Sequence, residues 1–171
     1  MLIRECSAMD IDALDRFLPT RPPGQVHVEH FALQEAGRWT YLVAWDDDAV
    51  PVGVGVIRWE GWSDQAALAA FPDCPELTNL QVHEARRRRG VGTALIQVAE
   101  ERVRARGFTR IGVGVADDNP KAAKLYARLG YADTGLRSVS RYMYPDDSGV
   151  PREIVECNAL LVKALGESRR R

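Results

Sequence analysis

The sequence contains no apolar run near the length of about 20 residues that a membrane-spanning helix needs. Its first residues, Met1 to Glu5, lack the basic segment and apolar core that mark a secretory signal. It also contains no internal repeat and no low-complexity block. We therefore expect a soluble cytoplasmic protein without a membrane partner.

Cysteine is scarce, with three residues at Cys6, Cys74 and Cys157. They form no Cys-x-x-Cys pair and have no histidines near them at metal-ligand spacing, which excludes the common zinc motifs. Residues 46–48 are three aspartates, but the spaced glutamate and other ligands of a calcium loop are missing. We expect a reducing compartment, no metal, and a solvated turn at residues 46–48.

Strong charge of one sign is also absent, since the formal net charge is −1. Residues 86–89 are four consecutive arginines, but no aromatic residues interleave them, which argues against a nucleic-acid partner. With 171 residues, the chain is long enough for one good core and short for two. We expect one domain over residues 1–168 and a basic tail over residues 169–171.

Residues 76–107 have the pattern of a strand, a glycine-containing loop and a helix. The helix is indicated by apolar residues that recur on one side, at Ala94, Leu95, Val98, Ala99 and Val103. The first amides of a helix lack backbone acceptors and carry the positive end of its dipole. Because Gly90 and Gly92 precede or open this helix, an anion could approach the backbone closely there. The stretch predicts a pyrophosphate site.

The rest of the chain also alternates between strand and helix patterns. Strands are expected over residues 2–6, 39–45, 50–59, 108–115, 136–144 and 155–165, and helices over residues 11–18, 28–36 and from Pro120, which Asn119 would cap. Residues 61–75 are hardest to interpret. They could form a wall of an acceptor pocket or a surface excursion that packs Phe71 on the core.

Two motifs carry a resemblance to a known family. Residues 87–92, Arg-Arg-Arg-Gly-Val-Gly, match the Arg/Gln-x-x-Gly-x-Gly/Ala signature of the GNAT superfamily of N-acetyltransferases, and residues 80–82 resemble that family's fourth strand. Residues 119–131 are similar to its second motif, with Asn119, Leu125-Tyr126 and Gly130-Tyr131 in the right order. The resembling region spans residues 76–131.

This resemblance implies an α/β fold of one domain, with a mostly antiparallel sheet, splayed parallel fourth and fifth strands, and flanking helices. It implies transfer of an acetyl group from acetyl-coenzyme A, a co-substrate, to a primary amine of a small molecule or peptide by direct attack. A protein of the same fold could instead bind acyl-coenzyme A without catalysis, as a sensor or scaffold. Many relatives form homodimers, but nothing in this sequence fixes the oligomeric state.

The resemblance also assigns residues to the co-substrate. Those expected to bind it are Leu80, Gln81, Val82, Arg87, Arg88, Arg89, Gly90, Val91, Gly92, Thr93, Asn119 and Tyr126. Tyr126 falls on the position whose hydroxyl lies near the sulfur in the family, and a phenol is protonated at neutral pH, so we predict it as general acid. Tyr126 could otherwise be a packed helix residue, and Asn119 only a helix cap.

The general base is less clearly marked. Glu76 occupies the position that resembles the catalytic glutamate of the histone acetyltransferase branch, and it is our first choice. Glu60, Asp73 and His83 stay open as alternatives, as does ordered water, whereas Cys74 has no base placed beside it by the sequence. The acceptor would be chosen by residues 19–38, 61–75 and 138–155, where no motif is found.

Overall fold

The computed structural model describes residues 1–20, 24–146 and 148–166, so the predicted tail at 169–171 lies outside the described residues. The strands are β1 (Leu2–Glu5), β2 (Trp39–Trp45), β3 (Pro51–Arg58), β4 (Glu76–Val82), β5 (Arg110–Ala116), β6 (Ala132–Pro145) and β7 (Pro151–Ala164). The α-helices are α1 (Ile11–Phe17), α2 (Val26–Glu35), α3 (Gln65–Ala70), α4 (Val91–Ala105) and α5 (Pro120–Arg128). Short 3₁₀ helices cover Ala8–Asp10 and Glu84–Arg86.

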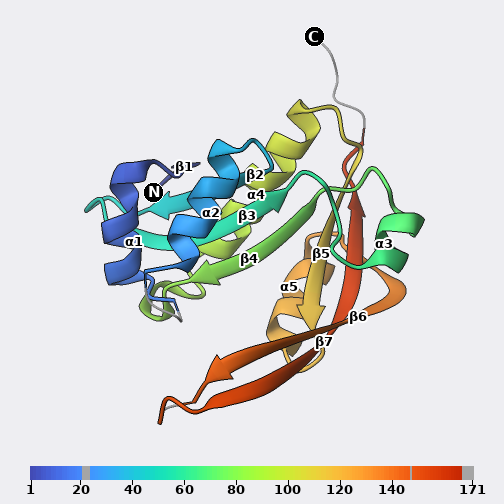
Figure 1. Cartoon of the computed structure of the whole chain (residues 1–171). Coiled ribbons are helices and arrows are strands. Elements are labelled where there is room, and N and C mark those ends of the chain that lie inside the picture. Colours follow the sequence, from blue (N-terminus) through green and yellow to red (C-terminus); the bar gives the residue numbers. More distant parts are fainter. Residues whose placement is uncertain (21–23, 147, 167–171) are drawn as a thin grey trace.

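The strands form a single seven-stranded sheet in the order β1-β2-β3-β4-β5-β7-β6 (Figure 1). Neighbouring strands are antiparallel except β4 and β5, which run parallel. The predicted α/β fold, with a mostly antiparallel sheet and one parallel pair at the fourth and fifth strands, is confirmed. Among the described residues, no helix has the length and apolar character needed to cross a membrane.

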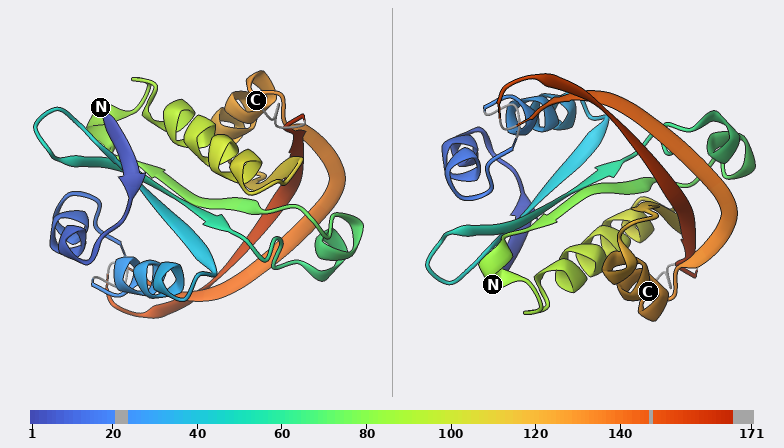
Figure 2. Two further views of the ribbon diagram at one scale, coloured as in Figure 1. Left: turned by 90° about the horizontal axis from the view of Figure 1, so that it is seen from above. Right: turned by 90° about the horizontal axis from the view of Figure 1, so that it is seen from below.

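Helices cover the two faces of the sheet unequally. Helices α4 and α5 lie on one face, whereas α1 and α2 lie on the other, over β1 to β3 (Figure 2). We call these the α4 face and the α2 face. Buried residues gather on each face: Leu42, Ile57, Leu77, Leu95 and Val113 belong to the α4-face cluster, and Leu14, Leu18, Tyr41, Val54 and Val56 to the α2-face cluster. The sheet therefore separates two apolar cores.

Helix α4 packs through the apolar stripe that the sequence predicts. Of the predicted stripe, Leu95, Ala99 and Val103 are fully buried, and Ala94 and Val98 are half-buried. Ile96, which the prediction leaves out, is fully buried as well. Burying each of the larger side chains contributes about 1.5–3 kcal/mol relative to exposure. The helix approaches β3 closely at Gly53, where a methyl group would lie 3.0 Å from Val91 Cγ1 and 3.1 Å from Leu95 Cδ1. This contact holds the first turn of α4 against the sheet.

Helix α2 begins at Val26, two residues before the predicted start at Val28. Its buried residues are His27 and His30, whereas Phe31 packs half-buried against the α2-face cluster, so the helix has no continuous apolar stripe. His27 Nδ1 lies 2.6 Å from the Tyr41 hydroxyl, and its Nε2 lies 2.9 Å from Leu18 O. These hydrogen bonds allow a histidine to occupy the core.

The turn between β2 and β3 is the hairpin turn that the sequence predicts. Asp46 Oδ1 accepts hydrogen bonds from the amides of Asp48 at 3.1 Å and Val50 at 3.0 Å. Its other oxygen, Oδ2, pairs with Arg86 Nη2 at 2.7 Å. Asp46 thus fixes the turn and ties it to the loop before α4.

Residues 61–75 pack on the α2 face of the sheet beside β5. The Trp62 ring lies directly on Gly112 and leaves no room there for a Cβ. Phe71 is half-buried against a small cluster that includes Trp62 and Leu160 of β7. This is the packing expected of a surface excursion over the core, and a role in acceptor binding stays a prediction.

Strands β6 and β7 are longer than the predicted 136–144 and 155–165, because each extends to 14 residues. Their far ends project beyond the helices as a hairpin (Figure 1). There the side chains are largely exposed on both sides, as at Val139, Met143 and Val155. The hairpin is stabilised by polar contacts between its strands, such as the hydrogen bond that Tyr142 Oη donates to Glu156 Oε1 at 2.7 Å. Without one buried face, the alternating pattern that marks a strand is absent.

Candidate active site

The parallel strands β4 and β5 pair only at their beginnings. The register joins Glu76 to Gly112 and Leu77 to Val113, and in the described residues it goes no further. The strands then diverge. The β5-facing edge of residues 80–82 is therefore free of strand pairing, so their backbone groups can pair with an extended ligand.

A bulge in β4 accompanies this divergence. Between the pairs Val54↔Gln81 and Val56↔Thr78, β4 contains one residue more than β3. Asn79, in this bulge, has a φ of +50°. Asparagine tolerates the left-handed region better than most residues. A bulge bends its strand and increases local twist, and here it lies where β4 leaves β5.

Helix α4 begins at the end of β4 with free amides. Gly90, its N-cap, has a φ of +83°, and a methyl group there would meet nothing within 4 Å. A methyl group on Gly92 would meet only Val82 Cγ2, at 3.7 Å. In the described residues, Ala94 is the first of the helix whose amide donates to a backbone carbonyl, that of Gly90 at 2.9 Å. The amides of residues 91–93 are thus available to an anion.

The arginines before α4 have different surroundings. Arg86 pairs with Asp46, and Arg87 Nε donates to Val82 O at 3.2 Å, so these two tie the loop to the protein. Arg88 and Arg89 are exposed. Arg88 has a φ of +61°. Two arginines are therefore free to add positive charge near the helix start, and two brace it.

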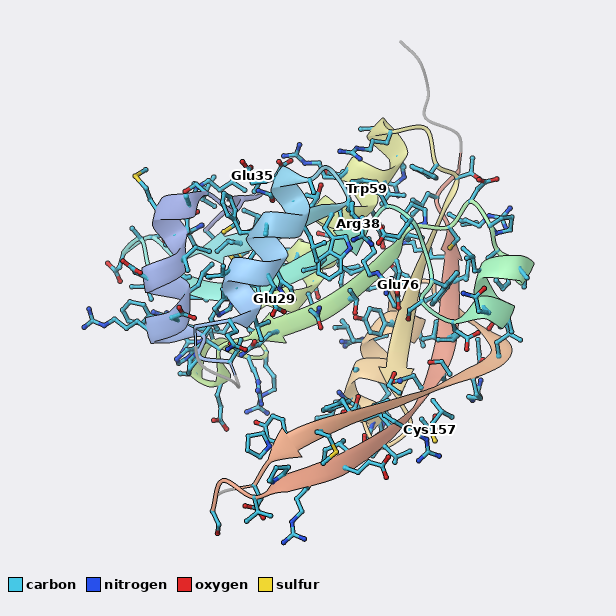
Figure 3. The ribbon with its side chains drawn as sticks, viewed as in Figure 1. Glu29, Glu35, Arg38, Trp59, Glu76 and Cys157 are labelled. Carbon is cyan, nitrogen blue, oxygen red and sulfur yellow. The ribbon has the colours of Figure 1, made fainter. Side chains whose placement is uncertain are left out.

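Glu76 lies at the beginning of β4, beside β5 (Figure 3). It is 9% exposed, and burial raises the pKa of its carboxyl group to about 7, against the opposing effect of Arg58. Arg58 Nη1 lies 3.3 Å from Glu76 Oε2. The other oxygen, Oε1, lies 3.8 Å from where a methyl group on Gly114 would be. The carboxylate thus faces β5 on the α2 face of the sheet.

Tyr126 lies in α5, within the α4-face cluster that includes Val113 and Val115 of β5. It is 5% exposed, and burial raises the pKa of its phenol to about 12. Its ring contacts Tyr131 edge to face, with centroids 5.3 Å apart. Its hydroxyl has no hydrogen-bond partner among the described residues. The structure therefore brings Tyr126 beside β5 from the face opposite to Glu76.

Asn119 caps α5, as one of its two predicted roles requires. Its Oδ1 accepts a hydrogen bond from the amide of Ala122 at 3.1 Å. Pro120 follows as the first helical residue. A contact of the side-chain amide with the co-substrate stays a prediction.

The alternative bases have less favourable surroundings than Glu76. Glu60 pairs with Arg38 at 2.8 Å at the surface, and Asp73 is exposed. His83 Nδ1 accepts a hydrogen bond from the Ala85 amide at 3.3 Å. Cys74 is buried, and burial raises the pKa of its thiol to about 12, which disfavours the nucleophilic thiolate. Among the described residues, no group of three or more His, Cys, Asp or Glu side chains could hold a metal ion.

Sequence reasoning missed several polar residues on the α2 face near Glu76. Arg58 contacts Glu76, and Asn79 Nδ2 lies 3.3 Å from His30 Nε2. One signal was readable: Thr78 and Asn79 are two polar residues between Leu77 and Leu80, which breaks the alternation of a strand and indicates a bulge. Arg58 and His30 gave no comparable signal.

A model of the acetyltransferase (GNAT) family matches residues 8–131, which is most of the chain. Solved structures share the fold. An N-acetyltransferase from Staphylococcus aureus Mu50 superposes with a TM-score of 0.72 at 13% identity, covering 96% of this chain and 98% of that one. A putative acetyltransferase from Salmonella typhimurium, solved with its cofactor acetyl-CoA, gives 0.70 at 16% identity, covering 100% and 97%.

A phosphinothricin acetyltransferase from Sinorhizobium meliloti, in complex with acetyl-CoA, gives a TM-score of 0.70 at 17% identity, covering 98% of this chain and 90% of that one. At such identities the likeness shows the fold alone. The family model, together with the diverging strands and the glycine loop at the start of α4, shows more. The chain belongs to the acetyltransferase (GNAT) family.

Proposed function

We propose that this protein transfers the acetyl group of acetyl-coenzyme A directly to a primary amine of a small molecule or peptide. The observation that carries the proposal is the gap between β4 and β5. A helix start with free amides lies at the end of β4, and the buried carboxylate of Glu76 lies at its beginning. A long anionic thioester laid along β4 would extend from one to the other.

The co-substrate would be held mainly by backbone. The pyrophosphate binds the amides of residues 91–93, where Gly90 and Gly92 leave space for its oxygens. Arg88 and Arg89 add positive charge. The pantetheine arm follows the free edge of residues 80–82 in the manner of an added strand. Several solved relatives contain acetyl-CoA or coenzyme A, which supports this co-substrate here.

Glu76 would accept the proton of the attacking amine. A base is most effective when its pKa lies near the working pH, and burial raises the pKa of Glu76 to about 7. The amine nitrogen then bonds to the carbonyl carbon, and the carbon–sulfur bond breaks. The products are the N-acetylated amine and the thiol of coenzyme A.

Tyr126 would supply the proton that the departing thiolate takes. Because burial raises the pKa of its phenol to about 12, the group is protonated at neutral pH. Its hydroxyl is not engaged with another described residue, so it is free to donate. Glu76 and Tyr126 approach β5 from opposite faces, so one can face the nitrogen that forms the new bond to the carbonyl carbon and the other the sulfur that leaves it.

Calorimetric titration with acetyl-coenzyme A, followed by measurement of thiol release with a panel of amines, tests the proposal. We expect binding and amine-dependent release. Binding without release on any amine would favour a non-catalytic sensor or scaffold. Absence of binding would show that the glycine loop and the β4 edge are not a co-substrate site.

A further inference from the structure

Three side chains form a row across β2, β3 and β4 on the α2 face. The register places Trp39 opposite Arg58, and Arg58 opposite Glu76. The Arg58 guanidinium lies 5.8 Å from the centre of the Trp39 ring and pairs with Glu76 at 3.3 Å. A fourth residue, His30 of α2, contacts Trp39 with ring centroids 5.3 Å apart. The row thus runs from α2 to the proposed base.

Three buried nitrogen atoms of this cluster have no hydrogen-bond partner in the part of the chain that the structure describes. They are Arg58 Nε, Trp39 Nε1 and His30 Nδ1. The first two can only donate. Buried donors without partners are costly, and native proteins rarely keep them without a reason. A ligand that carries hydrogen-bond acceptors would complete this cluster.

The charges of the row indicate which hydrogen-bond acceptors such a ligand would carry. Arg58 and Glu76 form an ion pair whose 3.3 Å separation is longer than the 2.7–2.9 Å typical of charge-assisted hydrogen bonds. Arg58 keeps 20% of its side chain exposed, so a ligand can reach its guanidinium. The neighbouring Arg38 is paired with Glu60 at 2.8 Å. Arg58, unlike Arg38, can therefore accept a second anion beside Glu76.

A zwitterion is the natural complement of such a pair. Its carboxylate can bind an arginine in two parallel hydrogen bonds, while its ammonium group faces the neighbouring carboxylate. In that arrangement two positive and two negative charges alternate, so no charge is buried without a partner. It also puts the ammonium nitrogen beside the group that would remove its proton.

Building on the proposed acetyl transfer, we infer that the acceptor is an amine with a carboxylate on the adjacent carbon, that is, a free amino acid. Arg58 binds the carboxylate, and the indole N–H of Trp39 donates to one of its oxygens. Glu76 faces the amine. Arg58 and Trp39 thereby select the acceptor, and Glu76 serves the reaction.

The test measures thiol release from acetyl-coenzyme A with matched sets of acceptors, after a screen of the standard L-amino acids. Each set contains an amino acid, its primary amide and its decarboxylated amine, and the amino acids are L-phenylalanine, L-leucine and L-histidine. A hydrogen-bonded charge pair is worth about 10- to 100-fold in an equilibrium constant. We expect the amino acids to exceed the amides and amines by that factor in kcat/KM.

Variants then ask whether Arg58 and Trp39 cause the preference. Arg58→Met should abolish it, Arg58→Lys should keep part of it, and Trp39→Phe should reduce it by about 3- to 10-fold because one donor is lost. The measured quantity is the ratio of amino acid to amide, which a general loss of folding would not change. The control is Arg38→Met, because Arg38 is a surface arginine in a nearby ion pair. This variant should leave the ratio unchanged.

The outcomes separate this inference from the function on which it rests. Transfer to amides and simple amines as fast as to amino acids would overturn the amino-acid acceptor and leave the acetyltransferase standing. A preference that survives in Arg58→Met would also overturn it. Binding of acetyl-coenzyme A with no transfer to any amine would overturn both.

Discussion

The loop at the start of α4 and the polar row on the α2 face are built from different materials. The loop offers backbone amides, and Gly90 contributes a φ of +83° and open space. The row offers side chains from three strands, with Arg58 and Glu76 joined at 3.3 Å. Backbone atoms suit a ligand part that is the same in every reaction, and side chains can be changed to suit an acceptor. We therefore expect that mutations can change the binding of the co-substrate and the choice of acceptor separately.

Removing the charge at Glu76 should have the largest effect, and it should change the rate of transfer without changing the binding of acetyl-coenzyme A. Glu76→Gln keeps the shape of the side chain but cannot accept the proton of the amine. Because a general base contributes about 10²- to 10⁴-fold, kcat should fall by that range. Affinity for acetyl-coenzyme A, measured by calorimetry, should not change.

Glu60→Gln is the matched control, because Glu60 is an alternative base that already pairs with Arg38 at the surface. It should leave kcat unchanged. If Glu60→Gln slowed the reaction and Glu76→Gln did not, the base would have been misassigned.

An acidic residue in the first turn of α4 should instead weaken the binding of acetyl-coenzyme A. Gly92→Asp places a negative charge where the pyrophosphate binds, and affinity for acetyl-coenzyme A should fall about 100-fold, because like charges repel strongly at close range. The folded state should not suffer, since an acid favours a helix N-terminus.

Gln65→Glu adds the same charge to the first turn of α3, at an exposed position. It should leave the co-substrate affinity measured by calorimetry unchanged. Thermal unfolding then shows whether both variants keep the stability of the wild type. Normal binding by folded Gly92→Asp would mean that the phosphates lie elsewhere.

Two tyrosines in contact provide the smallest predicted change in rate. Tyr126→Phe should lower kcat about 10- to 100-fold without changing stability, because its hydroxyl has no partner among the described residues. Tyr131 Oη instead donates to Glu100 Oε1 at 3.1 Å. Tyr131→Phe should therefore lower the free energy of unfolding by about 1 kcal/mol and leave kcat unchanged.

Chemical denaturation and thiol release measured on the same samples distinguish the two tyrosines. An equal rate in wild type and Tyr126→Phe would exclude Tyr126 as the general acid.

The same contrast explains how much could be predicted from the sequence. The co-substrate region depends on short-range features, such as Gly90 before an apolar stripe, and these can be recognised directly. The row depends on register, since Trp39, Arg58 and Glu76 are brought together by strand pairing over more than 35 residues of chain. Helix α2 begins two residues before its predicted start because its buried residues are histidines, and the β6–β7 hairpin extends beyond its predicted bounds because its end has no buried face.

The central claim, that Glu76 accepts the proton at the gap between β4 and β5, is tested most directly by the pH dependence of kcat/KM for the amine, which reports the protein before the amine binds. Burial raises the pKa of the Glu76 carboxyl group to about 7, and the neighbouring charge of Arg58 opposes that rise. Below that pH the carboxyl group is protonated and cannot act as a base. With saturating acetyl-coenzyme A, kcat/KM for the amine should therefore rise with pH through a group whose pKa is about 7 in the wild type. This titration should be absent in Glu76→Gln, and a titration that persists there would contradict the assignment.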